Sequence, residues 1–161
     1  MAANDVIGKP LPAQTDVIER GPVMNFARAV KDDSPIYSDP SAAAEAGLGA
    51  NPAPPTYAFA MHHFGAFPDL QPEGAGDTNP IMDAIGALMQ SGGLVLHGEQ
   101  EFVYHRPIQV GDVLTSRGTI KDLYEKQGSS DTMTFVVTET EWLDQDQQPV
   151  VTSLMTLLHR A

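Results

Sequence analysis

The residues best suited to chemistry lie in one short stretch, Lys31-Asp32-Asp33-Ser34-Pro35-Ile36-Tyr37. It places a carboxylate, Asp32, a few positions before a phenol, Tyr37. Proton transfer to and from a substrate needs one group that accepts a proton and one that donates it. Tyrosine has an ordinary pKa near 10, so Tyr37 could donate a proton or orient a water but is a weak base. The same residues also suit an ordinary polar turn after a helix, and spacing alone does not separate the two interpretations.

Composition limits the functions to which these residues could contribute. The 161 residues are 42% hydrophobic and 19% charged, which fits one folded domain with a core of ordinary size. The absence of cysteine excludes a disulfide scaffold, a thiol nucleophile and a zinc ribbon. A net charge of -12 argues against nucleic acid or an anionic membrane as the partner. The N-terminus lacks a basic segment followed by an apolar one, so we expect no signal peptide and a cytoplasmic location.

Helical signals dominate the first part of the chain. Proline near a helix start, alanine-rich runs and apolar residues at helical spacing indicate several helices. The uncharged segment from Pro54 to Pro68 is predicted to form one long helix that is buried nearly all round. The other predicted helices span Pro22 to Val30, Pro40 to Gly47, and Asn79-Pro80 to Gln90.

Strand signals dominate the last third, where β-branched residues alternate with polar ones and turn residues separate the runs. We predict strands over Glu101 to Ile108, Val113 to Glu125, Thr132 to Leu143 and Val150 to His159, with an earlier one around Ala13 to Arg20. This order predicts a single α+β domain over residues 1–161, in which a curved antiparallel sheet wraps around a long central helix. Such a sheet leaves an edge strand and a face to cover, so we expect pairing with a second copy or a partner chain.

A family resemblance becomes visible at this point and covers nearly the whole chain. Phe26 to Tyr37 resembles the hydratase loop of the MaoC-like, hot-dog-fold (R)-specific enoyl-CoA hydratases, which reads roughly Gly-Asp-x-Asn-Pro-x-His. Ala53-Pro54-Pro55-Thr56 is similar to the start of the family's central helix, and the segment from His97 to Gly111 matches a family strand. The chain is most similar to the N-terminal-type MaoC dehydratase domains, which include the less catalytic subunits of paired dehydratases.

The resemblance implies roles for particular residues. Asp32 falls on the catalytic aspartate, Tyr37 on the catalytic histidine, and Ser34 on the asparagine of the loop. In the family, the Asp and His pair adds water across an enoyl thioester or removes it. Thr56 would supply an N–H group to the thioester oxygen, although Pro54-Pro55 offers none. His97 is the nearby residue that could compensate for the missing imidazole, or it could be a buried hydrogen-bonded residue.

The resemblance also implies a ligand, an acyl-CoA thioester, with no metal and no cofactor beyond the CoA of the substrate. An acidic carrier protein would be repelled by the net charge, which favours CoA. The positively charged side chains that could make a few specific contacts with the CoA phosphates include Arg117, Lys121 and Lys126. The residues expected to bind substrate are Arg28, Lys31, Ser34, Pro55, Tyr57 and Arg106.

Several alternatives remain open. His62 and His63 occupy consecutive helix positions, so they cannot readily share a metal. The helix from Pro80 to Gln90 is either a lid over an acyl tunnel or a packed surface helix. The leading hypothesis is an (R)-specific enoyl-CoA hydratase or 3-hydroxyacyl-thioester dehydratase. The alternative is a non-catalytic partner subunit that shapes the acyl tunnel for a catalytic chain, and a thioesterase on the same fold is a third.

Overall fold

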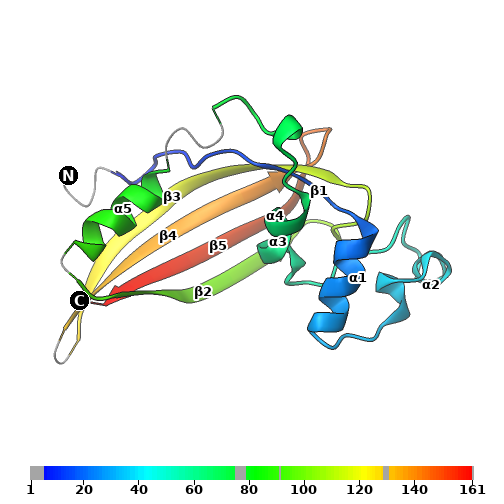
Figure 1. Ribbon diagram of the computed structural model, residues 1–161, viewed down its shortest axis with the longest axis horizontal. Coiled ribbons are helices and arrows are strands. Elements are labelled where there is room, and N and C mark those ends of the chain that lie inside the picture. The colour runs from blue at the N-terminus through cyan, green and yellow to red at the C-terminus, as the bar shows by residue number, and fades with distance from the viewer. Residues whose placement is uncertain (1–5, 75–78, 91, 129–130, 161) are drawn as a thin grey trace.

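A five-stranded, strongly curved antiparallel sheet forms the body of the computed structural model (Figure 1). The structure describes residues 6–74, 79–90, 92–128 and 131–160. The strands follow the order β1-β3-β4-β5-β2 across the sheet, so β1 and β2 lie at its two edges. Their bounds are β1 (Thr15–Val17), β2 (Leu94–Tyr104), β3 (Val113–Gln127), β4 (Thr132–Leu143) and β5 (Pro149–Arg160).

The strand predictions are confirmed in number and order, and β4 has its predicted bounds. β2 begins at Leu94, where the sequence changes to strand patterning and ahead of the alternation that starts at Glu101, and it ends before Ile108. Its first residues owe their extended conformation to pairing with β5, which sets Leu94 opposite Arg160. The register shifts between His97 and Glu99, where a bulge re-aims the strand. The sequence also predicts a loop over Asp69 to Thr78 and a hairpin loop over Lys126 to Asp131, and part of each lies outside the described residues.

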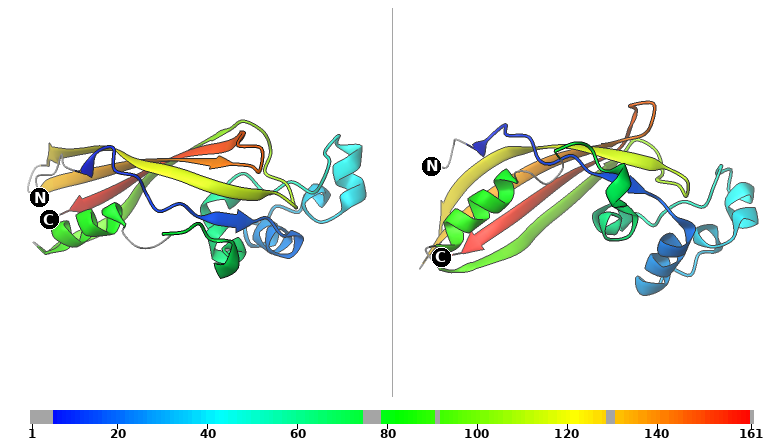
Figure 2. Two further views of the ribbon diagram at one scale, coloured as in Figure 1. Left: turned by 90° about the horizontal axis from the view of Figure 1, so that it is seen from above. Right: turned by 45° about the horizontal axis from the view of Figure 1, so that its top comes forward.

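Helices cover one face of the sheet and extend past one of its ends. Figure 2 shows α4 and α5 on the same side of the sheet, and Figure 1 shows α1 and α2 beyond its end. Asn79 caps α5, since its side chain accepts a hydrogen bond from the Ile81 N–H at 3.1 Å. The helices are α1 (Arg20–Ala29), α2 (Pro40–Glu45), α3 (Tyr57–Ala60), α4 (His62–Gly65) and α5 (Pro80–Met89), with 3-10 turns at Pro35–Tyr37 and Pro68–Leu70.

None of the helices among the described residues has the length and apolar character that crossing a membrane requires.

The expectation of one long buried helix from Pro54 to Pro68 is wrong. The helical conformation starts at Tyr57, continues through Met61 (φ -59°, ψ -35°) between α3 and α4, and ends at Ala66 (φ -83°, ψ 76°). It is also only half-buried, because Phe59 and Phe64 are 45% and 47% exposed. The absence of charge therefore marks a helix with an uncovered apolar side, which is a surface open to another chain.

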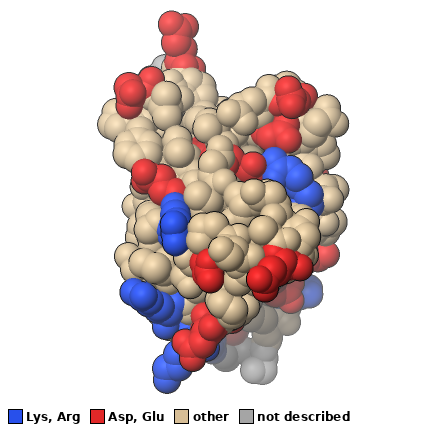
Figure 3. Space-filling model, turned by 90° about the vertical axis from the view of Figure 1, so that its right-hand side faces the viewer, with Lys and Arg blue, Asp and Glu red and all other residues tan. Residues whose placement is uncertain are grey.

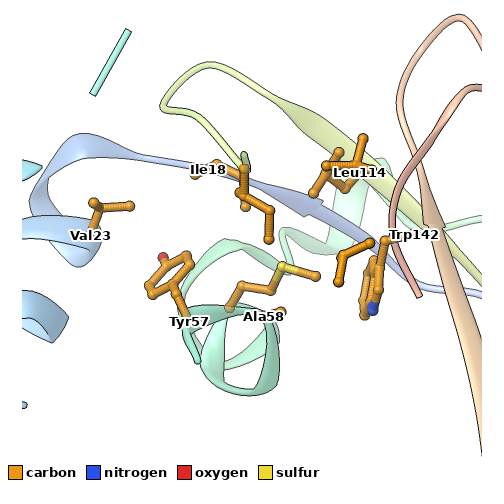
Figure 4. Close-up of a cluster of buried hydrophobic side chains, with 10 residues drawn as sticks. Ile18, Val23, Tyr57, Ala58, Leu114 and Trp142 are labelled. Carbon is orange, nitrogen blue, oxygen red and sulfur yellow. The ribbon is translucent and has the colours of Figure 1, made fainter. Parts of the chain in front are cut away.

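The core lies where this short helix meets the sheet. Tyr57, Ala58 and Met61 of the helix belong to one buried cluster with Leu114 of β3 and Trp142 of β4, and Figure 4 shows the Tyr57 ring on the side of Val23 and Ile18. The rings of Phe26 and Tyr57 meet edge to face with centroids 5.3 Å apart, which joins α1 to the same cluster. The core thus fixes the positions of α1 and α3 relative to the end of the sheet.

Gly65 lets the helix approach β1 closely enough to build this core. A Cβ at position 65 would lie 2.2 Å from the Val17 carbonyl oxygen, which belongs to the backbone and cannot rotate away. Gly65→Ala should therefore lower the free energy of unfolding by about 3 kcal/mol or more, measured by urea denaturation. The matched control is Gly86→Ala in α5, where a Cβ meets nothing within 4 Å. The control should leave stability unchanged or raise it by up to about 1 kcal/mol, and equal effects of the two variants would contradict the packing argument.

Candidate functional site

The chain leaves α1 through a left-handed residue that sets the direction of the Asp32 loop. Lys31 has φ 60°, a conformation that glycine adopts far more readily than lysine. The N–H of Asp32 donates to the Ala27 carbonyl at 2.9 Å and closes the end of the helix. The hydratase loop that this stretch resembles has glycine at the position of Lys31. The left-handed backbone at Lys31 therefore gives the physical reason for a glycine at this position.

Asp32, Ser34 and Tyr37 come together as expected. The Ser34 N–H donates to Asp32 Oδ1 at 3.2 Å, and the turn Pro35–Tyr37 brings the phenol back toward that carboxylate. Asn51 holds the loop against the body of the domain by donating from Nδ2 to the Ile36 carbonyl at 2.7 Å. A cavity of about 140 Å³ lies between the loop and α1, lined by Met24, Ala27, Arg28, Asp32, Asp33, Ser34, Tyr37 and Ser38.

Tyr37 carries its phenol in the neutral form in this cavity. Its side chain is buried, and burial is the main reason that its pKa rises above 10. The Asp32 carboxylate raises the pKa of Tyr37 further, both by its charge and by accepting the phenol hydrogen bond. The phenol therefore stays neutral around pH 7 and occupies one of the carboxylate's acceptor positions.

The other two candidate catalytic residues lie elsewhere. Thr56 is exposed at the start of α3 and does not line the loop cavity. His97 is exposed on β2, and its ring packs 5.1 Å from that of Phe59. Among the described residues that line the loop cavity, none is a histidine. The structure thus gathers two of the four candidate catalytic residues, Asp32 and Tyr37.

Three of the residues expected to bind substrate have structural contacts. Arg106 is bound on both guanidinium nitrogens to Asp112 (2.8 and 3.1 Å) and on one to Asp144 (3.2 Å). Hydrogen bonding to Asp112 is the main reason that the pKa of Arg106 rises. Tyr57 is fully buried in the core, and the Pro55 carbonyl accepts a hydrogen bond from the Tyr104 hydroxyl at 2.6 Å. Arg28 alone among the expected cations lines the loop cavity within the described chain.

Charge on the face that carries α1 and α2 is mixed. Figure 3 shows lysine and arginine side chains on that face scattered among acidic ones, with uncharged surface between them. Lysine and arginine side chains therefore form no continuous patch in this view. Within the described residues, no group of histidine and acidic side chains is arranged to hold a metal ion.

A second hollow, which the sequence reasoning missed, lies on the inner face of the sheet. This groove of about 350 Å³ runs between the sheet and the segments that carry Ala58, His62 and Ile81. Burial lowers the pKa of His62, so its imidazole tends to be neutral there. Thr138, Thr140 and Trp142 alternate along β4 and so lie on one face of that strand. The sequence alone did not show that this face lines a groove, because that depends on how the strands pair. The residues that β2 to β5 contribute are Gln100, Phe102, Ser116, Gly118, Thr138, Thr140, Trp142, Ser153 and Met155.

Three comparisons place the chain among known proteins. Residues 5–153 match the family model described as FAS1-like, dehydratase domain region. A UPF0336 protein of Thermobifida fusca is 37% identical over 163 residues, covering 99% of this chain and 95% of that protein. The ChsH1-ChsH2 complex of Mycobacterium tuberculosis matches with a TM-score of 0.78 at 21% identity, over 98% of this chain and 92% of the other. The C-terminally truncated HadBC (3R-hydroxyacyl-ACP dehydratase) complex from the same organism matches with a TM-score of 0.70 at 24% identity, over 97% and 98%.

Proposed function

The chain belongs to the family of FAS1-like dehydratase domain regions, with a MaoC-like hot-dog fold, and on that premise we propose that it is one subunit of an (R)-specific 3-hydroxyacyl-thioester dehydratase or enoyl-thioester hydratase. In this proposal it holds the acyl group of the thioester and stabilises a second MaoC-like chain. That second chain carries the complete aspartate and histidine pair. The reaction needs no cofactor beyond the thioester itself.

The observation that carries the proposal is the pairing of Asp32 with a neutral phenol. Hydration of an enoyl thioester requires a group that takes a proton from water and a group that delivers one to carbon. At neutral pH the neutral phenol of Tyr37 cannot take the proton from water, and its raised pKa makes it a weaker proton donor than an imidazole would be. The prolines before Thr56 also remove two backbone N–H groups from the start of α3, where developing charge on the thioester oxygen would be stabilised.

The exposed edge of the sheet is a second argument for a partner chain. β2 lies at the edge of the sheet and exposes Leu94, Leu96 and Val103. An edge strand with apolar side chains is a surface to which another strand can add. The described proteins of similar fold include two complexes, HadBC and ChsH1-ChsH2. A second copy of this chain could occupy the same edge, so the proposal predicts a dimer in either case.

A hydratase that works alone is the second candidate, and one observation favours it. Asp32 and Tyr37 meet in a single cavity that Arg28 also lines. In that mechanism Asp32 takes the proton from water and Tyr37 donates one to the substrate carbon. The loop resembles hydratases rather than thioesterases, which leaves a thioesterase as the least supported reading.

Activity assays with and without a partner separate these candidates. The chain is purified alone and also co-expressed with a MaoC-like chain that carries the complete aspartate and histidine pair. Hydration of crotonyl-CoA and of longer enoyl thioesters, on CoA and on acyl carrier protein, is followed by loss of enoyl absorbance. We expect the complex to exceed the isolated chain by about 10² to 10⁴-fold, the usual contribution of positioned acid and base groups. Full activity of the isolated chain would establish the solo hydratase, and release of free CoA would establish a thioesterase.

A further inference from the structure

The groove on the inner face of the sheet is more polar than a plain alkyl chain requires. Two adjacent rungs of cross-strand neighbours make up most of its floor. One rung joins Gly118, Thr140, Ser153 and Phe102, and the next joins Thr138, Met155 and Gln100. Hydroxyl and amide groups therefore alternate with the apolar surfaces of Trp142, Phe102 and Met155 along the groove.

Gln100 carries an unsatisfied acceptor in this floor. Its Nε2 donates to the Leu154 carbonyl at 3.1 Å, which fixes the orientation of the amide. Its Oε1 is buried and has no hydrogen-bond partner among the described residues. Leaving such an acceptor unpaired costs about 1 to 3 kcal/mol. A feature with that cost needs a physical reason, and a donor on a bound ligand would supply one.

No side chain among the described residues donates to Gln100 Oε1. The residue directly across from it on β5 is Met155, which has no hydrogen to donate. Thr138 lies beyond Met155 on β4, so its strand is roughly 10 Å from β2. The hydroxyls of Thr138 and Thr140 nevertheless face the same groove and can donate to, or accept from, a polar group on a ligand.

We propose that this groove selects an acyl chain that carries a hydroxyl group beyond the β-carbon over a plain alkyl chain of the same length. The ligand hydroxyl donates to Gln100 Oε1, and Trp142, Phe102 and Met155 contact the methylene groups around it. A plain chain in the same place would keep the acceptor buried and unpaired. The inference rests on the proposed function, because it assumes that the acyl group of a thioester occupies this groove.

Trp142 makes the test independent of turnover. It is the single tryptophan of the chain and lines the groove, so its fluorescence reports occupancy. The purified chain is titrated with decanoyl-pantetheine and with a series of decanoyl-pantetheines that carry one hydroxyl at successive positions beyond the β-carbon. We expect at least one hydroxylated isomer to bind about tenfold more tightly than the plain thioester, the effect of one buried hydrogen bond.

Gln100→Leu should abolish that preference and tighten the binding of the plain thioester. The control is Gln90→Leu at the exposed end of α5, which should keep the wild-type preference. Equal affinities for all isomers in the wild-type chain, or a preference that survives Gln100→Leu, would overturn the inference while leaving the proposed function intact. If none of the thioesters changes the Trp142 fluorescence, the acyl-binding role in the proposed function fails as well.

Discussion

Tyr37→His should give the isolated chain a hydratase activity on crotonyl-CoA about 10²-fold above that of the unaltered chain. The substitution replaces a phenol whose pKa lies above 10 by an imidazole with an ordinary pKa near 6.5, beside the same Asp32 carboxylate. An imidazole both accepts and donates protons near neutral pH, so the loop would gain the group that the reaction lacks. The gain sits at the low end of what acid–base groups contribute because Pro54-Pro55 still withhold two N–H donors.

Two further variants make this result specific. Tyr37→Phe removes the phenol hydroxyl without supplying a base, and it should stay as inactive as the unaltered chain. Asp32→Asn combined with Tyr37→His should lose the new activity, because the imidazole then lacks its carboxylate partner. If Tyr37→His folds but shows no gain, residue 37 is not what withholds turnover, and the start of α3 becomes the element to alter.

Asp16→Asn should stabilise the protein at pH 7.5 by up to about 3 kcal/mol. Asp16 is fully buried on β1 opposite Leu114, and its Oδ2 has no hydrogen-bond partner among the described residues. Burial raises the pKa of Asp16 from 3.8 to about 6, against opposing effects of the Gln14 hydrogen bond at 3.0 Å and of the His63 charge. A raised carboxyl pKa means that the protonated form stabilises the fold. That stabilising contribution is fully present below pH 3.8 and is lost as the pH rises through about 6. The rise in the pKa of Asp16 corresponds to roughly 3 kcal/mol of folding free energy.

Urea denaturation between pH 4 and pH 8 measures this effect. The unaltered chain should lose stability across that pH range relative to Asp16→Asn, which has no titrating side chain at position 16. Asp146→Asn, at the exposed turn between β4 and β5, is the control and should follow the unaltered chain. Parallel curves for the unaltered chain and Asp16→Asn would show that the buried carboxyl does not titrate in this range. Tyr57 responds to the same charge, since burial and then Asp16 raise the pKa of its phenol to about 12.

The sequence by itself determined the elements whose signals are local. β4 was predicted with its observed bounds because a run of β-branched residues between turn residues favours an extended chain wherever it sits. The start of α5 followed from Asn79-Pro80, since a capping side chain and a fixed proline φ act within one turn. The Asp32 loop was located because its residue types recur at fixed spacing in a family, and its contacts span few residues.

Only the tertiary structure decided features that depend on distant partners. The segment from Pro54 to Pro68 looked like a long buried helix, but burial depends on what covers each side, and Phe59 and Phe64 stay 45% and 47% exposed in the described chain. His97 and Thr56 lie away from the Asp32 cavity, and Arg106 forms ion pairs with Asp112 and Asp144 instead of lining that cavity. Both results depend on contacts between segments that are distant in the sequence. The groove around Gln100 exists because four strands in one register bring their alternate side chains to the same face. Register is a property of paired strands, so no single segment of the sequence contains it.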